Sequence, residues 1–290
     1  MRMRNGRWKI SKRKAMTYIF YGKMKNLKSQ HWFLLLRSLK VDVSVVTYNS
    51  GKTLDKCLNS IEKYVPVNRL LIGDGGSTDN TLKIARDHGA KIYLFRGEEN
   101  KIGRIRYKLA ELAETDWLLY VDSDVYLYQT FWPRVSRYVM EGVGMIMAAQ
   151  DGHPSPLQKY FEWRNRKFGF ITFSNTLVPR AVLLKVKELL NTHTGEDAIY
   201  GKRILEMGLK IVRIYEHLSF HDKDIQEFNL AFRRWGADLR TKKDVMELVK
   251  TILRHFRNTV LYTVEEQTLE GVPILLSQCF ELLKGYLILK

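Results

Sequence analysis

The feature that most constrains this sequence is an alternation of short apolar runs with amphipathic segments between residues 41 and 121. Runs rich in branched and aromatic residues predict strands at 41–47, 69–73, 91–95 and 117–121. The segments between them predict helices at 53–63, 77–88 and 103–114, the second capped by Ser77 and ended by Gly89. Because alternating strands and helices form parallel βαβ units, we expect an α/β protein with a doubly wound, mostly parallel, Rossmann-like sheet.

The rest of the chain has a looser pattern. It predicts strands at 143–149, 170–178 and 209–215, and helices at 196–207 and 225–235. From Lys242 onward the sequence is helical, and we expect its first apolar stripe to pack on the domain: Val245, Leu248, Ile252, Leu253 and Phe256. A second stripe over 274–290 fits either packing or a membrane interface, with Lys284 and Lys290 at the headgroups. These patterns divide the chain into a basic arm (1–40), a main domain (41–240) and a helical extension (241–290).

Charge is concentrated at the start of the chain. The 290 residues carry a net charge of +17, and residues 1–40 hold twelve lysines and arginines and no acidic residue. Such an arm suits an anionic membrane or nucleic acid, and equally a solvated tail. No run reaches the ~18–20 apolar residues that span a bilayer, and Cys57 and Cys279 lack metal-ligand spacing. We therefore expect a cytoplasmic protein, or one bound peripherally to the cytoplasmic face of a membrane.

Two carboxylates, Asp122 and Asp124, close the buried strand predicted at 117–121. Open α/β sheets collect their ligands at the carboxyl ends of strands. Carboxylates one residue apart at that edge can hold a hard cation, and the cation can hold a diphosphate. The alternative is a solvated turn whose aspartates cap the next helix.

Polar turns follow the first two strands at the same edge. Thr47-Tyr48-Asn49-Ser50-Gly51 follows the first, and a glycine-rich turn over 73–81 follows the second. Asp74 leaves its strand at this edge, where a carboxylate can accept hydrogen bonds from a nucleobase or ribose. The glycines let the backbone approach a ligand closely, and helix-start amides favour anions.

Taken in order, these motifs resemble the start of a family 2 glycosyltransferase with a nucleotide-sugar-binding (GT-A) fold. The matching elements are Thr47-Tyr48-Asn49, the run from Asp74 to Asp79, Arg106, and Asp122-Ser123-Asp124. Gly75 stands where the family usually has a second acid, and Tyr107 where it has Asn. The resemblance covers roughly residues 41–240.

The resemblance implies a role for each matching residue. Thr47, Tyr48 and Asp74 would contact base and ribose, with Asn49 and Ser123 in the same nucleotide-sugar site, and Arg106 would contact base or phosphate. Asp122 would contact ribose or metal, and Asp124 would ligate Mn²⁺ or Mg²⁺. Asp197, in the Glu-Asp pair that opens the helix at 196, would be the general base, and His221 would complete the metal site. Acidic residues are also favoured in a first helical turn without any catalytic role.

The function implied is inverting transfer of a sugar from a UDP- or GDP-sugar to a glycan, lipid-linked or protein acceptor. A single in-line displacement needs one general base and no carboxylate nucleophile. Two other functions stay open: a non-catalytic basic protein that binds nucleic acid or membranes, and a nucleotidyltransferase. Nucleic acid is disfavoured as a partner because the acidic residues at the strand ends repel phosphate unless a cation intervenes.

Overall fold

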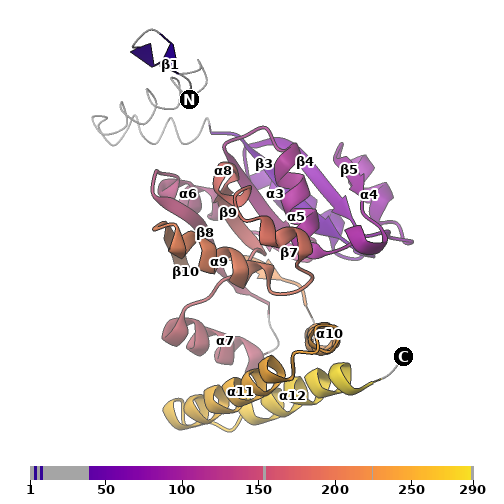
Figure 1. Ribbon diagram of the computed structural model, residues 1–290, viewed down its shortest axis with the longest axis vertical. Coiled ribbons are helices and arrows are strands. Elements are labelled where there is room, and N and C mark those ends of the chain that lie inside the picture. The colour runs from indigo at the N-terminus through magenta and orange to yellow at the C-terminus, as the bar shows by residue number, and fades with distance from the viewer. Residues whose placement is uncertain (1–2, 5–6, 9–38, 153–154, 224, 289–290) are drawn as a thin grey trace.

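The computed structural model describes residues 3–4, 7–8, 39–152, 155–223 and 225–288. Most of the basic arm predicted at 1–40, and Lys290, therefore lie outside the described residues. Within the arm, β1 (Met3–Arg4) and β2 (Arg7–Trp8) form an antiparallel pair. The other described strands form one eight-stranded sheet, which is flanked by helices and has a helical layer at one end (Figure 1).

The sheet has the order β5-β4-β3-β6-β9-β8-β10-β7. Its strands are β3 (Val41–Thr47), β4 (Val67–Asp74), β5 (Lys91–Leu94), β6 (Trp117–Asp122), β7 (Val125–Leu127), β8 (Val143–Asp151), β9 (Asn175–Pro179) and β10 (Lys210–His221). Strands β5, β4, β3 and β6 are mutually parallel, and β8 is parallel to β10. Only β9 and β7 run against their neighbours. The predicted α/β fold of GT-A type, with a mostly parallel sheet, is confirmed.

Helices cover both faces of the sheet, because alternate strand residues point to opposite faces. One face packs against α3 (Leu54–Tyr64), α4 (Thr81–Asp87) and α6 (Phe131–Val135). The other packs against α5 (Ile102–Leu112), α8 (Arg180–Leu183) and α9 (Glu196–Glu206). Short 3₁₀ turns occupy Gly97–Glu99, Ser136–Tyr138 and Lys187–Asn191. The apolar residues that gave the helical and strand periodicities form these two cores.

Several predicted boundaries were wrong, among them the end of the helix predicted at 225–235, which continues to Thr241. The helix predicted to start at Ser77 starts at Thr81, because the Ser77 backbone N–H and hydroxyl both donate to Asp74 instead of capping. The strand predicted at 170–178 starts only at Asn175, after a turn in which Ser174 N–H donates to Thr172. The strand predicted at 209–215 continues to His221, with shifts in its register against β8. Gly89, at positive φ, follows the end of its helix as predicted, and Gly208, also at positive φ, follows the end of α9.

The helical layer consists of α7 (Ser155–Phe168), α10 (Ile225–Thr241), α11 (Val245–Glu265) and α12 (Gly271–Leu287), which lie together below the sheet in Figure 1. Helices α10 and α12 cross at two glycines. A Cβ on Gly236 would lie 2.0 Å from the carbonyl oxygen of Leu282, and one on Gly285 would lie 1.9 Å from that of Arg233. The two backbones therefore touch at a distance that no larger residue allows.

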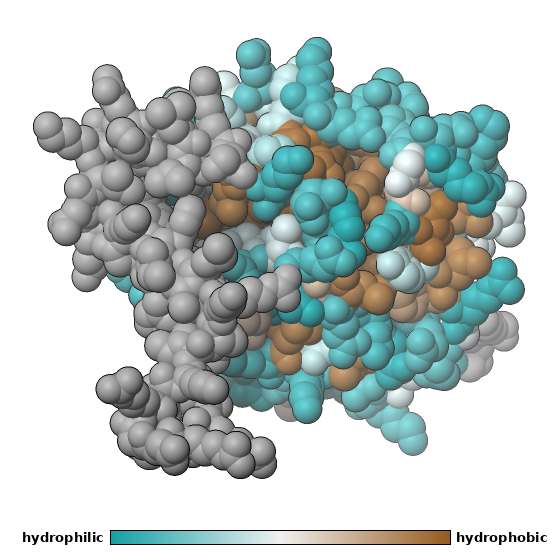
Figure 2. Space-filling view, turned by 90° about the horizontal axis from the view of Figure 1, so that it is seen from above, coloured by the Kyte–Doolittle hydropathy of each residue, from teal (hydrophilic) through white to brown (hydrophobic). Residues whose placement is uncertain are grey.

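The prediction that the first C-terminal stripe packs on the domain was half wrong. Leu248 and Ile252 pack against Leu239 and Leu282, but Val245, Leu253 and Phe256 are 55–61% exposed. The exposed side of α11 is itself an apolar stripe: Met246, Val249, Leu253, Phe256, Val260 and Val264. Helix α12 exposes a second: Leu276, Phe280, Leu283 and Leu287. We call these ten residues the outer face. Figure 2 looks onto the opposite end of the molecule, where hydrophilic side chains surround patches of hydrophobic ones.

One buried histidine in α11 makes the fold sensitive to acid. Burial of His255, together with the positive charges of Arg254 and Arg164, lowers its pKa to about 4 from 6.5. The unfolded chain then binds a proton that the folded chain excludes, so stability is lost as pH falls from 6.5 towards 4. His255→Phe should remove this loss, which is about 1 kcal/mol at pH 5.5 and about 3 kcal/mol near pH 4.

Urea unfolding of both proteins at pH 7.5, 5.5 and 4.5 checks this. The free energy of unfolding of His255→Phe, relative to that of the unsubstituted chain, should increase as pH falls. His193→Gln, which alters an exposed histidine, serves as the matched control and should not change the slope. A gap that stays constant across the three pH values would contradict the prediction.

Candidate active site

The candidate active site is a cleft of about 960 Å³ at the carboxyl ends of β3 and β6. The turns after these strands line it together with the start of α9 and parts of α10 and α11. Six residues predicted from sequence line the cleft: Thr47, Tyr48, Asp122, Ser123, Asp124 and Asp197. The four that do not are Asn49, Asp74, Arg106 and His221. Each of these four is adjacent or bonded to a lining residue.

Asp74 organises the two turns that follow β3 and β4. Its side chain is fully buried, and one carboxylate oxygen accepts from the N–H groups of Gly76 and Ser77, at 2.9 and 2.8 Å. The other oxygen accepts from the hydroxyls of Thr47 and Ser77. Asn49 joins the same network by accepting from Thr78 N–H. These bonds leave the Tyr48 ring, 59% exposed, at the mouth of the cleft, where a base could stack on it.

Arg106 lies beneath the cleft between two acids. Its Nη2 donates to Asp122 Oδ1 at 2.8 Å, and its Nε lies 3.3 Å from Glu196 Oε1. Burial by itself would raise the pKa of Asp122, but the charge and hydrogen bond of Arg106 lower it below its ordinary value. Burial raises the pKa of Glu196 to about 7, against the opposing effect of Arg106. The arrangement keeps Asp122 ionised at the edge of the cleft.

Asp124 lies beside two groups that carry or accept protons. Its Oδ2 is 3.3 Å from His221 Nε2 and 3.9 Å from Lys223 Nζ. Among the described residues, no group of three or more His, Cys, Asp or Glu side chains forms a ready-made metal site. A carboxylate and an imidazole are nonetheless suitable donors for Mn²⁺, and a cation that a diphosphate also coordinates needs few protein ligands. The residues present therefore fit a cation that arrives with a nucleotide.

Asp197 lies at the start of α9 and lines the cleft. Burial raises the pKa of its carboxyl above the ordinary value, against the opposing hydrogen bond from Ala198 N–H. A raised pKa makes the ionised carboxylate a better proton acceptor. Its neighbour Glu196 points inward instead, is 8% exposed and is held by Arg106.

Positive side chains from the loop after β10 and from the helical layer complete the cleft and were missed in the sequence. Lys223, Arg234 and Arg254 line it, and Glu247 of α11 pairs with Arg254 at 3.7 Å. Arg164 of α7 adds positive charge close to Asp197 and Arg254. The sequence contained the Arg234-Trp235 pair as a signal, but nothing local in it shows that residues from 241 onward return to the cleft.

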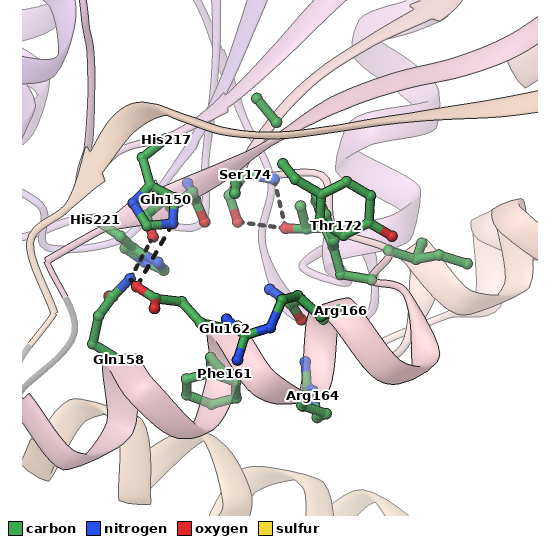
Figure 3. A pocket seen from close by; sticks show the side chains of 16 residues that line it. Gln150, Gln158, Phe161, Glu162, Arg164, Arg166, Thr172, Ser174, His217 and His221 are labelled. Atoms are coloured by element: carbon green, nitrogen blue, oxygen red, sulfur yellow. Dashed lines mark hydrogen bonds and ion pairs between the residues drawn. The ribbon is translucent and has the colours of Figure 1, made fainter. Parts of the chain in front are cut away.

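A second cavity of about 400 Å³ adjoins the cleft between β8, β10 and α7 (Figure 3). His217 lies in it with Nδ1 2.6 Å from Asp151 Oδ1 and Nε2 3.7 Å from Glu162 Oε1. This cluster faces Thr172 and Ser174 across the cavity (Figure 3). His221 lines the cavity and approaches Asp124 from this side, whereas His217 is engaged by two carboxylates away from the cleft.

Comparison with known families decides the classification of the chain. The model of Glycosyl transferase family 2 matches residues 42–193, more than half of the sequence. The chain belongs to this family. Among curated family relatives, the Bacillus phage SPbeta glycosyltransferase SunS is 27% identical over 85 residues, which is 29% of this chain and 20% of SunS. An uncharacterized glycosyltransferase of Rickettsia felis is 27% identical over 180 residues, 57% of this chain and 56% of that one. The chain thus spans about half, or less, of the length of these relatives.

Solved structures with the same family fold include glucosyl-3-phosphoglycerate synthase of Mycobacterium tuberculosis. The structure of that enzyme with Mn²⁺, UDP and glucosyl-3-phosphoglycerate superposes with a TM-score of 0.53 at 16% identity, over 74% of this chain and 84% of that chain. A further structure of it contains Mg²⁺ and UDP. At this identity the similarity establishes that the fold is shared.

Proposed function

We propose that this family 2 protein transfers a sugar, with inversion, from a nucleoside-diphosphate sugar to an acceptor hydroxyl. The observation that carries the proposal is that Asp122, Asp124 and Asp197 line one cleft together with Thr47 and Tyr48, at the turn after β3. Thr47 and Tyr48 would bind the nucleoside, with Asn49 and Asp74 fixing their turn. The glycosyltransferase names of the curated relatives support the same reaction class.

The diphosphate would lie between Asp124 and the positive side chains. Asp124 and His221 would hold Mn²⁺ or Mg²⁺, with Asp122 at the ribose or the cation and Ser123 between them. When bound, the cation would offset the negative charge of the leaving diphosphate. Lys223 and Arg234 lie where they could bind phosphate oxygens directly. Arg106 would act indirectly, by holding Asp122 ionised and in place.

Inversion is supported by the different surroundings of the two acids at the start of α9. Retention by double displacement would require a carboxylate nucleophile as well as an acid/base. Glu196 is the adjacent second carboxylate, but it is buried and forms an ion pair with Arg106 at 3.3 Å. Asp197 lines the cleft without an ion pair to Arg106, and it would accept the hydroxyl proton as the acceptor oxygen attacks the anomeric carbon.

Thermal unfolding with UDP, GDP and dTDP, each with and without Mn²⁺ or Mg²⁺, tests the proposal. A ligand at a hundred times its Kd should stabilise the protein by about 2.7 kcal/mol. One nucleotide should stabilise it in a metal-dependent manner, and Asp124→Ala should remove the metal-dependent part. Asp151→Ala, which alters an acid outside the cleft, is the control. Failure of every nucleotide to stabilise the unsubstituted protein would overturn the proposal.

A further inference from the structure

The outer face of α11 and α12 is an apolar surface without a partner in the described chain. Its side chains are between 37% and 70% exposed, and on each helix they recur every three or four residues. That spacing places them on one stripe per helix, and α11, with 21 residues, is about 30 Å long. Scattered exposed apolar residues need no explanation, but a continuous apolar surface of this length indicates an interaction site.

The outer face is separate from the side through which each of these helices packs against the rest of the protein. Helix α11 packs through a different set of residues, including Leu248, His255 and Tyr262. Helix α12 likewise packs through Ile274, Leu282 and Gly285. Both helices therefore have two apolar sides, one buried and one exposed. On each helix the exposed side lies opposite the buried side, and α11 and α12 contact each other, so both exposed sides face away from the core.

The charges around the outer face are positive. Lys243, Lys250 and Arg257 on or before α11, and Lys284 on α12, form no ion pair with any acidic residue in the described part of the chain. The acids of the same helices are already paired within the molecule. Glu247 pairs with Arg254, Glu265 with Lys167, and Glu281 with Arg233. These four positive residues around the outer face therefore attract an anionic surface.

We propose that the outer face binds to the surface of an anionic lipid bilayer, with both helices lying in the plane of the interface. Apolar side chains would enter the boundary between headgroups and acyl chains, and the lysines and Arg257 would contact lipid phosphates. Within the described residues no helix is long and apolar enough to cross a bilayer. A second copy of the chain fits less well, because a symmetric contact between two such faces brings like charges together.

Sedimentation with vesicles tests this proposal, and it does not depend on the proposed enzymatic activity. The intact protein is mixed with vesicles of phosphatidylcholine alone or with 30% phosphatidylglycerol, and the bound fraction is measured. The test variant replaces Leu253, Phe256 and Phe280 by Ser, which leaves the charge unchanged. The matched control replaces Leu94, Tyr138 and Leu205 by Ser, since these are also exposed apolar residues but lie outside the outer face.

We expect binding to the anionic vesicles, little to the neutral ones, and a loss of about tenfold or more in the partition coefficient for the test variant only. Because the three residues are exposed, the variant should fold, which circular dichroism verifies. Unchanged binding of the test variant would overturn the proposal and assign the binding to another basic segment. Absence of vesicle binding, with self-association in sedimentation equilibrium that the test variant abolishes, would overturn it in favour of a second copy.

Discussion

Replacing Asp197 by Asn is expected to lower kcat by roughly a thousandfold while nucleotide binding is retained. Asn has nearly the same shape but cannot take up the acceptor proton, and general base catalysis contributes about 10²–10⁴-fold. Asp197 is not among the residues proposed to bind the nucleotide or the cation, so the metal-dependent stabilisation by nucleotide should persist. The measurement is the initial rate of nucleoside diphosphate release, with a donor and an acceptor on which the unsubstituted protein is active.

The control is Glu206→Gln, an exposed acid at the other end of α9 that pairs with Arg203. Its rate should be close to that of the unsubstituted protein. In the pH profile, the unsubstituted protein should lose activity as pH falls through the raised pKa of Asp197, because the base becomes protonated. A fall in kcat of less than tenfold for Asp197→Asn, with the fold intact, would refute its role as the base.

Replacing Arg106 by Met should be the most destabilising single change at the site. Arg106 is 2% exposed, and its removal leaves Asp122 and Glu196 facing each other without a cation. Removing one partner of a buried ion pair typically costs about 3–5 kcal/mol. In a protein of this size the melting temperature should fall by on the order of 10 °C. Differential scanning calorimetry at pH 7.5 measures the change.

A double variant separates lost charge from lost packing. Arg106→Met combined with Glu196→Gln removes one of the two stranded carboxylates and should regain part of the stability, giving a measurable coupling energy. Arg106→Lys keeps a positive charge but loses the geometry that pairs Arg106 with both acids. Its free energy of unfolding should therefore lie between those of Arg106→Met and the unsubstituted protein. A decrease of less than about 1 kcal/mol in the free energy of unfolding for Arg106→Met would contradict the prediction. It would show that Asp122 and Glu196 take up protons or water at little cost.

The sequence was informative wherever function depends on residues close together along the chain. The βαβ rhythm predicted the parallel strands, and motifs at strand ends predicted Thr47, Tyr48, Asp122 and Asp124 as one cluster because carboxyl ends of parallel strands share an edge. The antiparallel β9 was placed five residues early, since the apolar pattern of 170–174 continues into a turn. Local patterns cannot distinguish a buried turn from a strand.

Contacts made across long stretches of chain could not be read from the sequence. The ion pair of Glu196 with Arg106 spans 90 positions, and Arg254 reaches the cleft from a helix predicted to be a separate extension. Apolar periodicity in α11 predicted an amphipathic helix, but not that Leu253 and Phe256 would lie outside while Leu248 is buried. Which of two apolar sides faces the core depends on the positions of α10 and α12, and only the fold provides them.

The crossing of α10 and α12 at Gly236 and Gly285 has a mechanical consequence. Two backbones in direct contact cannot slide without a clash, so the two helices should move as one rigid piece. Helix α10 brings Arg234 and Trp235 to the cleft, and α12 carries Phe280 and Leu287 on the outer face. Any tilt or displacement imposed on the outer face would therefore be transmitted to the cleft wall without an intervening hinge, and anchoring one end would limit how far the other can open.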